Sequence, residues 1–88
     1  MEAANKFLID KQLLDVESQL KELRQGHENF TPETLQRLQM QLITIISQDD
    51  FLKKTLPEPQ VIPERKLNKQ HLTILLNQIK ASIKQDLN

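Results

Sequence analysis

The chain has 88 residues, which is enough for one domain with a modest core and too few for two. Its twelve lysine and arginine residues equal its twelve aspartate and glutamate residues, so no overall charge draws it to nucleic acid or to an anionic membrane. Hydrophobic residues make up 38% and charged residues 27%, as in a folded chain, and the absence of cysteine excludes disulfides and thiolate metal sites.

The first residues show neither the basic region nor the apolar run of a secretory signal. No apolar run approaches the roughly 18 residues that a membrane span needs. Together with the missing cysteines, these features lead us to expect an intracellular protein with no membrane span.

The first predicted element is a helix over residues 2–25. Five apolar residues follow one another at spacings of four and three, which places them along one side of a helix: Ile9, Leu13, Val16, Leu20 and Leu23. Gly26 then stands where a residue in the left-handed conformation would end the helix.

The same helix carries apolar residues that this seam does not need. At about 100° per residue, Phe7 and Leu14 point well away from the seam, and Leu8 points in a third direction. Apolar patches of this kind mark interfaces, so we predict that these three residues bind a protein partner. The alternative is that Val61 and Ile62, later in the chain, cover Phe7 and Leu14 within one molecule.

A second helix is predicted over residues 32–47. Thr31 is a typical N-cap, and Pro32 suits the first helical position because its missing N–H is not needed there. The apolar positions spread over more than a third of the circumference, which indicates neighbours on two sides; they are Leu35, Leu38, Leu42, Ile43, Ile45 and Ile46. We assign the surplus on this helix, Met40, Ile43 and Ile46, to the same partner-binding surface.

A possible short helix follows at residues 48–55 and carries Phe51 and Leu52. Ser47 is either part of a continuous helix or the cap of this separate one, and we favour a break. Residues 56–66 contain three prolines and are predicted to form an extended linker. At about 3.1 Å per residue the linker spans roughly 30 Å, enough to return the chain along the length of a helix.

The last predicted helix covers residues 68–86, with Asn68 as its N-cap. Its apolar stripe is about 120° wide, and Lys80 and Lys84 lie on the solvent-exposed face of the helix. The stripe consists of Leu72, Leu75, Leu76, Ile79, Ile83 and Leu87.

These elements predict an all-α fold, a three-helix bundle that forms a single domain over residues 1–88. We expect a core built from all three long helices. It comprises Leu13, Val16, Leu20, Leu35, Leu38, Leu42, Ile45, Leu72, Leu76, Ile79 and Ile83.

Residues suited to catalysis are sparse. His27 and His71 are the only histidines and are expected in a solvated loop and a helix cap, and Asp49 and Asp50 are expected in a turn or helix start. A single glycine excludes a glycine-rich phosphate loop. We therefore predict no catalytic residue, no metal site and no cofactor.

Two functions remain. The surplus apolar positions favour a non-catalytic adaptor or assembly module that binds a helical protein partner or its own copy. The alternative is a small nucleic-acid regulator that uses the basic cluster of Arg65, Lys66 and Lys69, because helix N-termini attract phosphate. Nucleic acid is disfavoured, since the chain has no Trp or Tyr on which bases could stack.

Overall fold

The computed structural model describes residues 3–24, 26, 28, 30–56 and 60–86. All regular secondary structure within these residues is helical, which confirms the all-helical prediction. The elements are α1 (Ala3–Glu22), α2 (Pro32–Ser47), α3 (Asp50–Thr55), the 3₁₀ helix η1 (Glu64–Lys66) and α4 (Lys69–Asp86).

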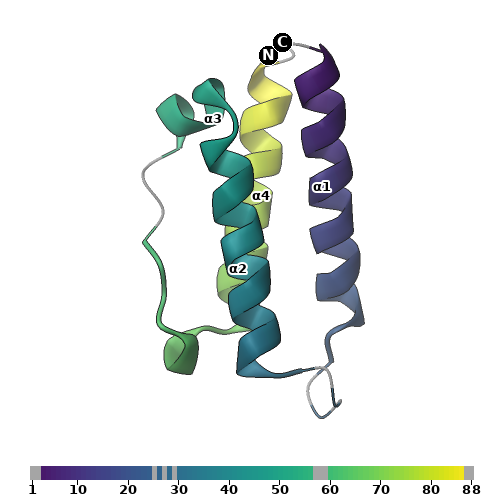
Figure 1. The fold of residues 1–88 in the computed structure, drawn as a ribbon, viewed down its shortest axis with the longest axis vertical. Coiled ribbons are helices and arrows are strands. Elements are labelled where there is room, and N and C mark those ends of the chain that lie inside the picture. The colour runs from purple at the N-terminus through teal and green to yellow at the C-terminus, as the bar shows by residue number, and fades with distance from the viewer. Residues whose placement is uncertain (1–2, 25, 27, 29, 57–59, 87–88) are drawn as a thin grey trace.

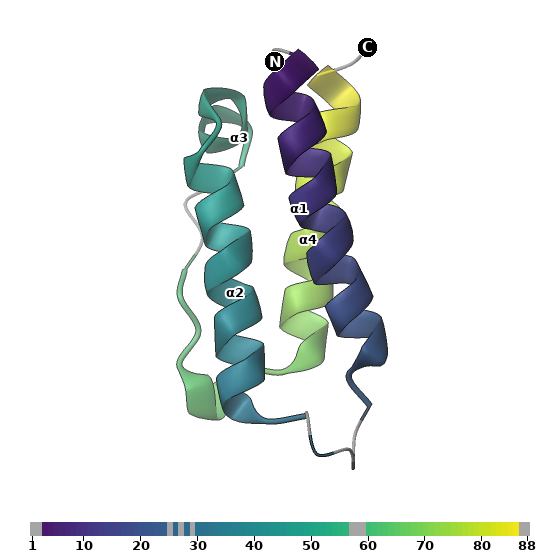
Figure 2. The same ribbon diagram turned by 45° about the vertical axis from the view of Figure 1, so that its right-hand side comes forward.

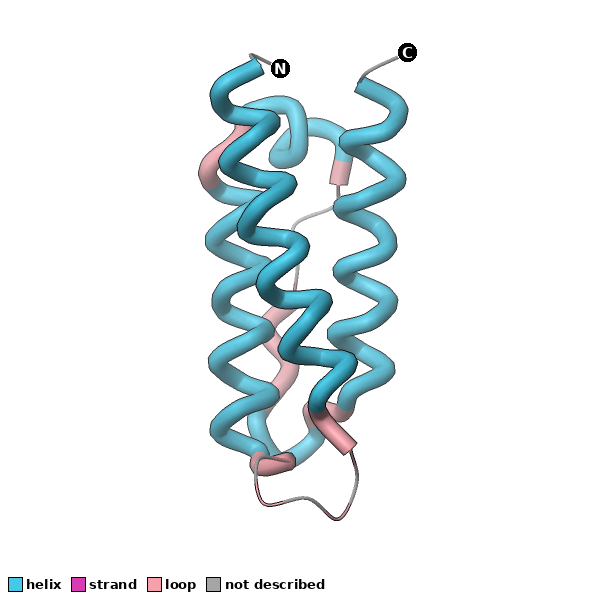
Figure 3. The backbone as a smooth tube through the Cα atoms, turned by 90° about the vertical axis from the view of Figure 1, so that its right-hand side faces the viewer, coloured by secondary structure: helices cyan, strands magenta, loops and turns pink. Residues whose placement is uncertain are grey.

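The three long helices lie alongside one another, and each of them contacts the other two (Figures 1 and 2). Helix α1 runs antiparallel to α2 and α4, and the short α3 folds over the end of α2, where it contacts α4 (Figure 1). Residues 60–63 run alongside α2 to η1, and α4 starts at the end of the molecule where α2 also starts (Figures 1 and 3). The molecule measures 40 × 23 × 17 Å, with its long axis along the helices.

The core lies between the three long helices and α3. Every side chain predicted for the core from the sequence is buried, and Leu38, Leu42 and Ile79 have no exposed surface. Leu52 of α3 and Leu67 before α4 close its ends. The spacing of apolar residues alone therefore identified the inward faces of all three long helices.

Side-chain caps start the helices at the expected residues. The hydroxyl of Thr31 accepts a hydrogen bond from the backbone N–H of Thr34 at 3.1 Å, and Pro32 occupies the first turn of α2. At α4, Asn68 Oδ1 accepts from the N–H of His71 at 3.1 Å, and His71 Nδ1 accepts from the N–H of Asn68 at 3.2 Å. This reciprocal pair is a capping box in which a histidine replaces the usual glutamate.

Helix α1 is shorter than predicted, ending at Glu22 and not at residue 25. The N–H of Leu23 still bonds to helix carbonyls, but its own carbonyl accepts a hydrogen bond from Lys69 Nζ of α4 at 2.8 Å. An ammonium group on a terminal carbonyl satisfies the end of a helix without another turn. Gly26 does take the predicted left-handed conformation, at φ 95°, but in the loop beyond that end.

The break after α2 is real, although its cap was misassigned. Asp49, not Ser47, is the N-cap of α3, and its Oδ1 accepts from the N–H of Leu52 at 3.0 Å. The hydroxyl of Ser47 donates back to the carbonyl of Thr44 at 2.8 Å. A serine inside a helix often bonds in this way, which leaves the capping position to the next polar residue.

The predicted linker at residues 56–66 is not extended throughout, because Glu64–Lys66 form the 3₁₀ turn η1. Residues 57–59, with two of its three prolines, lie outside the described part of the chain. Gln39 of α2, buried at 3% exposure, holds the returning segment: its amide donates to the carbonyl of Ile62 at 3.1 Å and accepts from the N–H of Ile62 at 3.0 Å. Ile62 packs against the core, whereas Val61 is 53% exposed.

None of the helices in the described residues is both long enough and apolar enough to cross a membrane.

Candidate interaction surfaces

The outer face of α1 carries large apolar side chains in solvent. Phe7 is 71% exposed, Leu14 is 63% exposed and Leu8 is 51% exposed. Phe7 and Leu14 are seven residues apart, about two helical turns, so they lie on one face opposite the buried seam. The alternative in which residues 61 and 62 cover Phe7 and Leu14 is wrong, because that segment is bonded to α2.

The three partner-binding residues predicted on α2 have different environments. Met40 is 43% exposed and Ile43 is half-buried. Ile46 was predicted to bind a partner, and this is wrong, because it is 4% exposed and belongs to the core. The reason is that α2 contacts α1, α3, α4 and η1, so the apolar surplus at its end is covered within the molecule.

A groove of about 360 Å³ lies between α1 and α2. It is lined by Gln12, Asp15, Val16, Arg37, Met40, Gln41, Thr44 and Ile45. A polar bridge crosses the two helices nearby, where Arg37 Nη1 donates to Gln19 Oε1 at 2.9 Å and Gln19 Nε2 donates to Asp15 Oδ2 at 3.0 Å. Leu8 lies one turn before Gln12, so this groove adjoins the apolar face of α1.

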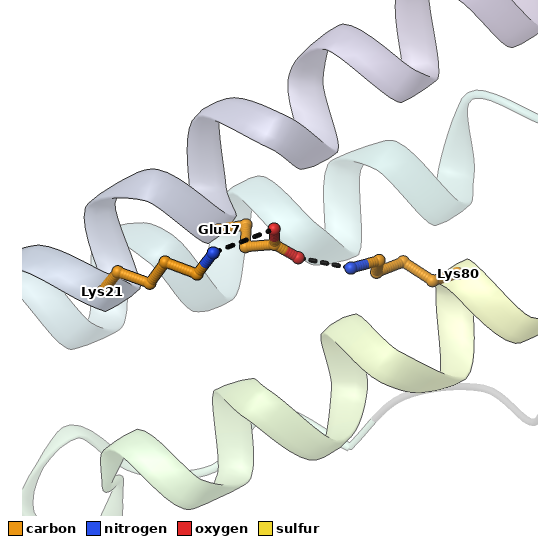
Figure 4. A network of polar contacts seen from close by, with 3 residues as sticks. All are labelled: Glu17, Lys21 and Lys80. Carbon is orange, nitrogen blue, oxygen red and sulfur yellow. Dashed lines mark hydrogen bonds and ion pairs between the residues drawn. The ribbon is translucent and has the colours of Figure 1, made fainter.

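A second groove, of about 390 Å³, lies between α1 and α4 and is rich in lysine. Figure 4 shows Glu17 of α1 between two of these lysines. Its carboxylate accepts a hydrogen bond from Lys80 of α4, and its other oxygen is 3.6 Å from Lys21 Nζ. The hydrogen bond and charge of Lys80, and then the nearby charge of Lys21, lower the pKa of Glu17 below its ordinary value.

The basic residues proposed for nucleic acid are divided between two parts of the molecule. The ammonium group of Lys69 is engaged on the carbonyl of Leu23 in α1. Arg65 and Lys66 are exposed in η1, which packs against α2. The structure therefore does not gather the three side chains around one anion position.

The titratable residues considered for catalysis have structural roles where they are described. His71 and Asp49 are helix caps, and Asp50 pairs with Lys53 at 3.3 Å. His27 lies outside the described residues. Among the residues with described side chains, no three histidine, aspartate or glutamate groups are close enough to hold a metal ion.

Several residues that shape these surfaces were not predicted from the sequence. Ile74 is 50% exposed on the outer face of α4, and its position outside the apolar stripe was a signal that could have revealed it. Glu17 and Lys80 are 63 residues apart, and no local pattern announces their contact. Comparison with protein-family models, curated proteins and solved structures finds no match to the chain, so a functional proposal rests on these surfaces.

Proposed function

We propose that the chain is a non-catalytic protein-interaction module, acting as an adaptor or assembly subunit. The binding surface is the outer face of α1, with Phe7, Leu8 and Leu14, together with the adjoining α1–α2 groove at Met40. A partner protein or a second copy of the chain covers this surface. The scaffold is a three-helix bundle of α1, α2 and α4, and residues 60–63 run alongside α2.

The observation that carries this proposal is the exposure of Phe7 and Leu14 beside a complete core. The inward side of α1 is already filled, since Ile9, Leu13 and Val16 are each at most 5% exposed. Burying a large apolar side chain is worth about 1.5–3 kcal/mol, so a partner that covers both residues gains several kcal/mol. Within the described structure, no segment provides that burial.

The α1–α2 groove supports the same function. Its size falls within the range of about 300–1,000 Å³ that accommodates bound groups, and Val16, Met40 and Ile45 give it an apolar component. A groove between two helices that adjoins exposed apolar residues suits an amphipathic helix, which inserts side chains at intervals of three and four.

The test is the association of the purified chain and of two variants, measured by light scattering over a concentration series and by capture from a lysate of the source cells. The first variant is F7Q/L14Q, because glutamine has nearly the helix propensity of leucine. The control is I74Q, which removes an apolar side chain of comparable exposure from the outer face of α4.

We expect the wild-type chain and I74Q to share one association, either with themselves or with a captured protein whose binding is reproduced with purified components. F7Q/L14Q should remain folded and lose that association. Equal association of F7Q/L14Q and I74Q would contradict the proposal, as would the absence of any association.

A further inference from the structure

Lysine residues gather on the side of the molecule where α1 and α4 meet, although the whole chain is neutral. Lys21 and Glu17 of α1 and Lys69 and Lys80 of α4 line the α1–α4 groove. The helical period adds Lys84, one turn beyond Lys80, and the ion pair of Lys6 with Asp10 further along α1. Five lysines thus accompany two carboxylates, so these seven residues together carry a net charge of +3.

The environment of Glu17 shows which chemistry these lysines accommodate. Lys80 and Lys21 hold its carboxylate between two helices, and Lys69 binds a carbonyl oxygen. An ammonium group has three N–H donors, and among the described residues each of these lysines contacts one oxygen-bearing partner. All three lysines therefore keep donors for an incoming carboxylate, and Lys21, with 76% of its side chain exposed, is the most accessible.

This groove is continuous with the apolar face of α1. Phe7, Leu14 and Lys21 follow one another at seven-residue intervals, so each lies about two turns, or roughly 10 Å, beyond the last on one face of the helix. A partner laid along α1 meets two apolar side chains and then a lysine at the mouth of the groove.

We propose that the α1–α4 lysine groove docks an acidic segment of the protein partner, with Asp or Glu side chains of the partner bound by Lys21, Lys69 and Lys80. This inference rests on the proposed function and names the chemistry of the partner. The partner face is apolar where it meets Phe7 and Leu14 and acidic where it meets Lys21.

Two features favour an acidic protein segment over nucleic acid. The carboxylate of Glu17 stands inside the groove, where it repels a continuous row of phosphates. The remaining lining residues are Leu20, Thr73, Leu76 and Asn77, which offer no ring on which a base could stack. Separate carboxylates on a peptide can bind on either side of Glu17.

The test uses the full chain and a fluorescent amphipathic helical peptide with leucine at heptad spacing and glutamate on the flanking positions. K21E/K84E reverses the charge of Lys21 in the groove and of Lys84 one turn beyond Lys80, and it leaves the contacts of Lys69 and Lys80 in place. K54E/K66E is the control, because it makes the same change in net charge at exposed positions in α3 and η1. Circular dichroism establishes that both variants are folded.

We expect K21E/K84E to bind the glutamate peptide about tenfold more weakly than the wild type does, as reversal of two surface charges implies. K54E/K66E should bind within about twofold of the wild type, since neither residue lines the groove. A peptide with glutamine in place of glutamate should bind weakly to all three proteins. Added salt should lower the affinity of the glutamate peptide and leave that of the glutamine peptide unchanged.

Equal binding by the two lysine variants would overturn the inference, as would no binding of the peptide to the wild type. Tighter binding of a single-stranded oligonucleotide of matched charge would overturn it too, and would assign the groove to nucleic acid. F7Q/L14Q separates this inference from the proposed function. If F7Q/L14Q lowers the affinity for the peptide and K21E/K84E does not, the proposed apolar interface is supported and the docking of an acidic segment is contradicted. If only K21E/K84E lowers the affinity, the lysine groove is supported and the apolar interface is contradicted.

Discussion

Replacing Gln39 with methionine tests how the segment before α4 is held in place. The Gln39 side chain is buried, and its amide makes both hydrogen bonds to the backbone of Ile62 and a third, at 2.8 Å, to Gln36. Methionine has a similar length and helix propensity but cannot replace these bonds. The substitution therefore isolates the polar contribution of the side chain.

The expected loss of stability is the smaller of the free-energy costs of two possible responses of the segment around Ile62. If the segment stays docked, the N–H and C=O of Ile62 are each left without a partner, at about 1–3 kcal/mol for each group. If it detaches, two hydrogen bonds are exchanged for bonds to water at about 0.5–1.5 kcal/mol each. Detachment also gives up the packing of half-buried Ile62 against the core, so we expect Q39M to lower the free energy of unfolding by about 2 kcal/mol or more.

Thermal unfolding followed by circular dichroism measures this loss. At about 4–8 °C per kcal/mol for a domain of this size, Q39M should lower Tm by about 8–16 °C. Trypsin should also cleave faster after Lys66, because detachment exposes the backbone around η1. Q78M, at an exposed position of α4, is the matched control and should be nearly neutral. A Q39M variant no less stable than Q78M would refute the assigned role of Gln39.

Two further predictions concern charges and caps. Replacing Asn68 with alanine removes the acceptor for the N–H of His71 and should lower the free energy of unfolding, measured by urea denaturation, by about 1 kcal/mol. Aspartate at this position should restore the stability, because its carboxylate can accept the same hydrogen bond. Equal stability of N68A and N68D would contradict the capping role of Asn68. Because the folded-state pKa of Glu17 is lowered, its ion pairs stabilise the chain above its ordinary pKa of 4.5, and this stability is lost as the pH falls through the lower folded value. Tm of the wild type should therefore fall more steeply than that of E17Q as the pH drops below 4.5, and parallel curves would contradict the pairing.

Features set by neighbouring residues were predictable from the sequence. Thr31 and Asn68 cap the helices that they precede, because a capping side chain reaches only two or three residues along the chain. The core positions followed from the helical period in the same way. Asp49 was expected in a turn or helix start, but the cap was assigned to Ser47, because serine and aspartate are comparable N-caps and the sequence around residue 48 offers both.

Features set by contacts between helices were not predictable. The bonds of Gln39 to Ile62, Lys69 to Leu23 and Lys80 to Glu17 join residues 23, 46 and 63 positions apart. Their formation depends on which helices are neighbours and how each is rotated about its axis, and a single sequence does not specify these quantities.

The candidate surface shows the same limit. The helical period identified an apolar surplus on both α1 and α2, but only the arrangement of the helices decides which surplus is covered. Helix α2 has neighbours in α1, α3, α4 and η1, so Ile46 is buried, whereas α1 contacts only α2 and α4 among the described elements. Phe7 and Leu14 remain exposed because they lie on the side of α1 that has no neighbour.

The central claim is that the core is complete without the outer face of α1, which leaves that face available to a partner. Urea unfolding of L13Q and L14Q tests it most directly, because these adjacent residues are 5% and 63% exposed. L13Q places an amide in the core and should lose about 3 kcal/mol or more, while L14Q should stay within about 0.5 kcal/mol of the wild type. A comparable loss of stability in L14Q would show that Leu14 is a core residue and would contradict the account.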